Sequence, residues 1–225
     1  MIRYCLVGVC LAVTFVLAGC GGKSDTPAAR QKNNLKSQTP EVRAKAAEEL
    51  GKADPADLVS AVPALLTALK DERPEVRQTA AQTLGQVPPA QHAKVVPALT
   101  ESLNDTNSDV RHKAALALSK IGPDAVPAKN KFIEMLRSGD PKDAWWACEA
   151  LGRMGPEASD AVSALMTQLD SPLRENRARA AWTLGRIGPS AAAATGKLSQ
   201  LTGDPEMCVR VSAENALHQI RGRGQ

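Results

Sequence analysis

The residue types that most often carry catalysis are few in this chain and lie far apart. Its histidines are His92, His112 and His218, and none has a second histidine at helical spacing, so no zinc motif is present. No glycine-rich phosphate loop follows a strand, because no segment alternates apolar and polar residues. The chain contains an internal repeat of about 33 residues, and other copies of it carry alanine at the position of Cys148, which favours a buried, unreactive thiol. The sequence therefore predicts no catalytic centre, no metal site and no cofactor.

Arginines recur at a fixed distance of seven residues before a leucine. They are Arg43, Arg77, Arg111, Arg177 and Arg210. An aspartate precedes three of them by six residues and a fourth by seven. These aspartates are Asp71, Asp105, Asp204 and, before Arg177, Asp170. A guanidinium can hold a carboxylate of its own or an adjacent layer through two parallel hydrogen bonds, and an aspartate can also cap the amides of a following helix. We interpret the series as a structural ladder between neighbouring layers, with a functional basic track as the alternative.

Three tryptophans fall on neighbouring segments of this pattern. Trp145 and Trp146 lie in the copy where alanine replaces the arginine, and Trp182 lies in the next copy. The slots of Trp146 and Trp182 hold mostly polar residues in the other copies, so the sequence predicts that these two side chains face solvent, whereas Trp145 is predicted to face solvent or the groove between layers. Exposed indoles are typical of binding hot spots, and His112 shares the slot of Trp145, so these four residues are candidate partner-binding residues. The alternative is that the indoles fold over the groove and supply the packing that the missing arginine would otherwise provide.

The elements that position these residues repeat about every 33 residues. One leucine anchors each copy: Leu50, Leu84, Leu118, Leu151, Leu184 and Leu217. An alanine stands four residues before each leucine: Ala46, Ala80, Ala114, Ala147, Ala180 and Ala213. This spacing predicts a helix with one buried stripe, and a second apolar stripe in each copy predicts a second helix. Neither helix can bury its apolar face alone, so stacked copies must form the core.

The unit resembles the HEAT repeat, in the short form also seen in phycobilisome lyase-type proteins. The resemblance rests on an aspartate closing one helix, Val-Arg opening the next, and then alanine and Leu-Gly, as in Asp71, Val76-Arg77, Ala80 and Leu84-Gly85. It covers about residues 30–221 and implies an all-α, right-handed α-solenoid of about five to six helical hairpins, with the Val-Arg helices on the concave side. The fourth copy departs from the pattern, because Asp143 and Ala144 stand where Val-Arg is expected.

The N-terminus predicts export. Residues 1–19 join a short positive start to an apolar run too short to span a bilayer, which indicates a signal peptide. Leu17-Ala18-Gly19-Cys20 resembles the lipobox of bacterial lipoproteins, which implies lipidation of Cys20 and anchoring to the cell membrane or outer membrane, facing the periplasm. The alternative is an ordinary secretory signal with an incidental cysteine. Residues 20–29 would then form a tether and residues 222–225 a tail. Cys148 and Cys208 lie two copies apart, so we expect two free thiols.

Charge narrows the function classes. Residues 21–130 carry 15 Lys/Arg against 13 Asp/Glu, and residues 131–225 carry 12 against 11, so no basic stripe indicates nucleic acid. We expect a monomeric, lipid-anchored scaffold that binds a protein or peptide and is not an enzyme. A lyase-like or chromophore-handling enzyme is the alternative that the family resemblance allows.

Overall fold

The computed structural model describes residues 26–222, and every regular element in that range is a helix. The helices form two layers that alternate along the chain. One layer consists of α1 (Pro27–Asn34), α3 (Pro55–Ala68), α5 (His92–Ser102), α7 (Lys129–Leu136), α9 (Val162–Gln168) and α11 (Thr195–Leu201). The other layer carries the arginine series and is called the arginine layer: α2 (Pro40–Gly51), α4 (Pro74–Leu84), α6 (Ser108–Ile121), α8 (Pro141–Met154), α10 (Arg174–Ile187) and α12 (Met207–Ile220).

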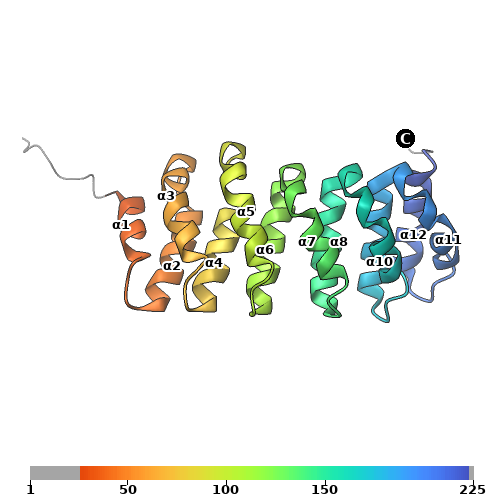
Figure 1. Ribbon diagram of the computed structural model, residues 1–225, viewed down its shortest axis with the longest axis horizontal. Coiled ribbons are helices and arrows are strands. Elements are labelled where there is room, and N and C mark those ends of the chain that lie inside the picture. Colours follow the sequence, from red (N-terminus) through yellow and green to blue (C-terminus); the bar gives the residue numbers. More distant parts are fainter. Residues whose placement is uncertain (1–25, 223–225) are drawn as a thin grey trace, which may run out of the picture.

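Within residues 26–222 the twelve α-helices pair into six antiparallel hairpins, which stack side by side in chain order (Figure 1). Helices of the arginine layer pack directly against their neighbours along the stack, whereas α3, α5, α7, α9 and α11 contact one another little. The architecture is an α-solenoid, as the repeat predicts. Short 3-10 segments lead into four helices of the first layer: η1 (Pro89–Gln91), η2 (Gly122–Ala128), η3 (Gly155–Ala161) and η4 (Gly188–Ala194).

The predicted buried stripes form the core. The leucines that anchor the repeat are fully buried in five copies, and Leu217 in the last copy is 7% exposed. The alanines four residues earlier are fully buried in all six copies. The buried side chains of all six hairpins form one continuous hydrophobic cluster, so each unit depends on its neighbours for a core.

Small residues bring the arginine-layer helices close together. Gly85 is the C-cap of α4, and it also lies in the contact between α4 and α6. A Cβ atom on Gly85 would lie 2.7 Å from both Cα and Cβ of Ala117 in α6. A Cβ atom on Gly185 would lie 2.8 Å from Cα of Ala216, so the glycine of the Leu-Gly pair sets the spacing between neighbouring repeats.

The solenoid begins earlier than predicted. Helix α1 starts at Pro27 rather than near residue 30, and the Thr26 hydroxyl accepts a hydrogen bond from the amide of Ala29 at 3.1 Å. Thr26-Pro27 is therefore an N-cap followed by a proline in the first turn, and the predicted tether of residues 20–29 overlaps this helix. The predicted signal peptide and Cys20 lie outside the described residues. Across residues 26–222, no helix is both long enough and apolar enough to cross a membrane.

Candidate functional site

Arginines of one repeat bind aspartates of the next. Nε and Nη2 of Arg77 donate to the two carboxylate oxygens of Asp105 at 2.6 and 2.7 Å. Arg43 binds Asp71 in the same bidentate geometry at 2.7 and 2.8 Å. Arg177 and Asp204 form the third such rung, at 2.9 and 3.0 Å. In each rung the aspartate thus lies 27 or 28 residues after its arginine, in the adjacent repeat.

A second set of contacts holds each guanidinium in place. Nη1 of Arg77 donates to the backbone carbonyls of Asp71 at 2.8 Å and of Glu72 at 3.1 Å. The carboxylate of Asp105 also accepts the backbone N–H of Asn107, which stabilises the turn before α6. Burial alone would raise the pKa of Asp105, but the hydrogen bonds from Arg77 and Asn107 outweigh it, so the pKa lies below its ordinary value. The pKa of Asp204 is likewise lowered, chiefly by the hydrogen bond from Arg177.

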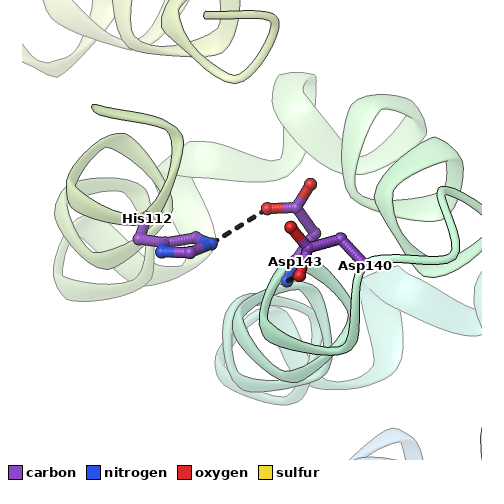
Figure 2. A group of neighbouring side chains, drawn as sticks. All are labelled: His112, Asp140 and Asp143. Atoms are coloured by element: carbon purple, nitrogen blue, oxygen red, sulfur yellow. Dashed lines mark hydrogen bonds and ion pairs between the residues drawn. The ribbon is translucent and has the colours of Figure 1, made fainter. Parts of the chain in front are cut away.

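The rung between the third and fourth repeats is built differently. Ser138 stands where the aspartate is expected, and Arg111 instead donates to Asp143 at 3.0 Å and to Asp140 at 3.3 Å. Nε2 of His112 lies 3.0 Å from the same Asp143 carboxylate, and Figure 2 shows the two side chains pointing toward each other. His112 is buried, so its predicted role as an exposed partner contact is wrong. The carboxylate of Asp143, in the first turn of α8, holds the imidazole of His112 inside the interface.

His112, Asp140 and Asp143 could together be considered as metal ligands, since one ligand atom of each lies within 4.8 Å of the others. The guanidinium of Arg111 contacts both carboxylates of this group, however. A cation would have to be held beside a fixed positive charge, which is electrostatically unfavourable. Asp140 is also committed as the N-cap of α8, accepting the amides of Lys142 and Asp143. The cluster is best explained as a polar rung of the ladder.

The next interface has no arginine rung. Ala144 is buried at the arginine position, and the aspartate position six residues before Arg177 holds Ser171. Asp170 does not join the ladder, contrary to the prediction, and pairs instead with Lys197 of the sixth repeat. Its position one residue earlier on the chain directs its side chain away from the arginine layer. The amide of Asn176 crosses this interface and donates to the carbonyl of Pro141 at 3.0 Å.

The three tryptophans form one cluster with Arg179. The rings of Trp145 and Trp146 meet edge to face, with centroids 4.7 Å apart and planes at 87°. The Arg179 guanidinium carbon lies 4.6 Å from the centroid of the Trp145 ring and 5.2 Å from that of Trp182. Both distances are within the range of a cation–π contact. All three indoles are half-buried, so Trp146 and Trp182 are less exposed than predicted, and each indole is partly covered in the groove between repeats as the alternative prediction has it.

Two residues of α8 hold this cluster in place. Glu149 accepts hydrogen bonds from Arg153 and Arg179, both at 2.8 Å, which orients the Arg179 guanidinium between the indoles. Gly152 provides room for Trp182, because a Cβ atom there would lie 2.2 Å from the indole ring. Trp146 packs against the hydrophobic core. The cluster therefore combines packing between α8 and α10 with exposed aromatic surface.

A surface pocket of about 300 Å³ opens beside the cluster, between α8, α10 and α12. Trp145, Arg179 and Trp182 line one part of it, and Glu175 and Cys208 line another. The pocket thus offers flat aromatic surface, a cation and a carboxylate within a small area. Such a surface can take up an apolar or aromatic side chain together with a polar group beside it.

The two thiols are free, as predicted, and their surroundings differ. Cys148 is fully buried, and burial raises the pKa of its thiol to about 12. Cys208 is exposed at the rim of the pocket. Of the two cysteines within residues 26–222, Cys208 is therefore the one accessible to reagents in the folded protein.

Sequence reasoning missed four residues that organise this surface: Asp140, Asp143, Glu149 and Arg179. Asp140 carried a detectable signal, because Asp-Pro at the start of a helical stripe is typical of an N-cap. Glu149 and Arg179 are 30 residues apart and meet only across the interface of two helices, so no local pattern identifies them.

Comparisons with known proteins agree with this geometry. A family model described as HEAT repeats matches residues 32–119 and 130–220. No match was found among curated protein sequences. The crystal structure of an engineered protein is similar, with a TM-score of 0.72 and 25% identity, covering 88% of this chain and 98% of that chain.

Two further structures show the same fold. A designed armadillo repeat protein in complex with the peptide (KR)4 has a TM-score of 0.70 and 17% identity, with 87% of this chain and 100% of that chain covered. The complex of CpcE and CpcF of phycocyanin lyase from Nostoc sp. PCC7120 has a TM-score of 0.61 and 26% identity, with 93% of this chain and 82% of that chain covered. The repeated hairpins, their buried register and the family match lead to one conclusion: the chain belongs to the HEAT-repeat family.

Proposed function

We propose that the protein is a lipid-anchored scaffold of the cell envelope that binds a protein or peptide partner through the pocket beside its tryptophan cluster. The main support for this proposal is that Trp145 and Trp182, with Arg179 between them, line one side of that pocket. Tryptophan and arginine are the residue types most enriched where truncation costs the most binding energy. Half-burial supports this role, because a rigid indole loses little conformational entropy when a partner covers it.

The surroundings of the reactive side chains favour a scaffold over an enzyme. His112 is buried and hydrogen-bonded to Asp143 inside the ladder, so its imidazole is not presented to a substrate at the surface. The high pKa of Cys148 keeps its thiol protonated and poorly nucleophilic. The likeness to a designed repeat protein in complex with a peptide is consistent with peptide binding by such a surface.

The pocket can be tested with the thiol at its rim. A benzophenone attached to Cys208 of the purified protein would cross-link a bound partner on irradiation, in extracts of the cells that make the protein. Trp145→Ala should reduce the yield of that cross-link about ten-fold or more, since a hot-spot truncation costs about 2 kcal/mol. Val42→Ala is the control, because Val42 is an exposed apolar side chain on α2 that does not line the pocket. Equal yields from Trp145→Ala and the unchanged protein would refute the proposal.

The anchor has its own test. Cys20→Ser should abolish labelling by a fatty-acid analogue and move the protein from the membrane to the soluble fraction, because two or three acyl chains make a stable anchor. Unchanged membrane association without detergent would contradict lipid anchoring.

A chromophore-handling lyase is the second candidate, and the likeness to the phycocyanin lyase subunits favours it. The two functions differ in absorbance. A protein that holds a chromophore should show a visible band after purification, whereas a scaffold should absorb only through its aromatic side chains near 280 nm.

A further inference from the structure

We propose that the open end of the ladder, at Arg210 on α12, docks an acidic segment of a protein partner. The partner's Asp or Glu carboxylate would take the place of the missing rung aspartate, and an apolar side chain beside it would cover Met207 and Val211. This surface is separate from the tryptophan cluster and does not depend on the function proposed above.

Arg210 is held in the same way as the rung arginines. Its Nη1 donates to the carbonyls of Asp204 at 2.8 Å and Pro205 at 2.9 Å. The corresponding contacts of Arg77 measure 2.8 and 3.1 Å. Since the anchoring is the same, the edge formed by Nε and Nη2 faces the side on which Arg77 receives Asp105. Within residues 26–222, no hydrogen bond reaches that edge of Arg210, so a preorganised fork for a carboxylate is left open.

The side chains around this fork are apolar and exposed. Met207 is 69% exposed and Val211 is 44% exposed, which makes them two of the four large hydrophobic side chains that are exposed in the described range. They lie four residues apart on α12 and flank Arg210, so the three side chains share one face of the helix. In the preceding repeat the position of Val211 is held by Ala178, which is half-buried. Val211 therefore lies where a following repeat would cover it, whereas Met207, whose counterpart Arg174 is exposed in the preceding repeat, lies at the rim of that surface.

A further hairpin of the same kind would not fit against the whole exposed face of α12. At the position of Glu214 the other repeats carry Ala47, Ala81, Ala115, Cys148 and Ala181, all fully buried. At the position of His218, four of the other repeats carry glycine, which permits the close approach of the next helix. Glu214 and His218 are both exposed and prevent that approach. Only the half of the face around Arg210 resembles an interior interface, so a short segment rather than a full hairpin is expected.

A second copy of this chain does not supply the missing group. The turn before α2, which corresponds to the turns that carry Asp71 and Asp105, has Ser37 at the aspartate position. Head-to-tail stacking would bring a hydroxyl rather than a carboxylate to Arg210. Pairing of two α12 faces would bring two guanidinium groups together. Charge complementarity thus indicates a different protein, one that presents a carboxylate at an exposed turn or chain end beside an apolar side chain.

The test uses the full chain in detergent and a display library of short linear peptides. Peptides enriched on the unchanged protein should carry Asp or Glu next to an apolar residue. Their affinity, measured by fluorescence anisotropy, should weaken about ten-fold or more in Arg210→Gln, since this variant cannot form the charge-assisted bidentate hydrogen bonds. Arg210→Lys should weaken it similarly, because an ammonium cannot form the fork.

Three controls make the result specific. Met207→Ser should weaken binding while the hydrogen bonds from Arg210 to the carbonyls of Asp204 and Pro205 stay intact. This variant therefore tests the site even if Arg210→Gln loosens the turn before α12. Arg137→Gln, an exposed arginine on the other layer, should leave the affinity unchanged. Trp145→Ala should also leave it unchanged, which separates this site from the tryptophan pocket.

Each of three results would overturn the proposal. The library could enrich no acidic peptides, or the enriched peptides could bind Arg210→Gln as tightly as the unchanged protein. Sedimentation could also show dimers that Arg210→Gln dissociates, in which case the occupant is a second copy.

Discussion

Replacing Gly85 with alanine should destabilise the solenoid, although alanine is the better helix former. The added Cβ would lie 2.7 Å from Cα and Cβ of Ala117, against an ordinary contact of 3.4–4 Å. Because one of those atoms is backbone, it cannot rotate away, and α4 and α6 must separate. Overpacking of this kind costs about 1–3 kcal/mol, and the helix propensity gained is at most about 1 kcal/mol. We expect a net loss of up to about 2 kcal/mol in the free energy of unfolding.

Gly196→Ala is the matched control. Gly196 lies in α11 with nothing within 4 Å of an added Cβ, so only the propensity term applies, and stability should rise by about 0.5 kcal/mol. Urea unfolding followed by circular dichroism compares the two variants. Hydrogen exchange should show the loss in Gly85→Ala to be greatest in α4 and α6, since coupling in a repeat protein is between neighbours. If both variants gained stability equally, the glycine would not set the spacing between layers, and the reasoning would be refuted.

Three further predictions follow from buried groups. Leu118→Ala should lower the free energy of unfolding by about 2–5 kcal/mol, measured in urea, because Leu118 is fully buried between repeats. The lowered pKa of Asp105 means that its contribution to stability is present above the ordinary value of 3.8 and is lost as the pH falls through the lower folded value. The fall in melting temperature between about pH 6 and about pH 2 should therefore be smaller in Asp105→Asn. A thiol reagent should modify Cys208 at once but Cys148 only on unfolding, as mass spectrometry would show.

These predictions can each fail clearly. A change below about 0.5 kcal/mol for Leu118→Ala would mean that the repeat register is wrong. If the melting temperature of Asp105→Asn fell with pH as much as that of the unchanged protein, the pKa of Asp105 would not differ between the folded and unfolded states. Modification of Cys148 in the folded protein would contradict its burial.

The repeat was readable from the sequence because its causes are local. Each helix must turn one apolar stripe inward, so leucine and alanine recur at helical spacing, and each hairpin must end before the next begins. The number of hairpins, the buried alanine and leucine positions and the free state of both thiols followed from that periodicity. The start of α1 was missed, although Thr26-Pro27 marks it.

Tertiary structure alone decided which side chains meet across the layers. The arginine spacing allowed a carboxylate from the same or the adjacent repeat, and the structure selects the adjacent one. Arg111 turns to Asp143, and His112 is drawn inward with it, because Ser138 offers no carboxylate at the usual position. Asp170, one residue out of register, is directed to Lys197 instead. Periodicity determines which face of a helix a residue occupies. A hydrogen-bond partner depends instead on which atoms of the next repeat lie within about 3 Å, and those atoms belong to residues some 30 positions away in the sequence.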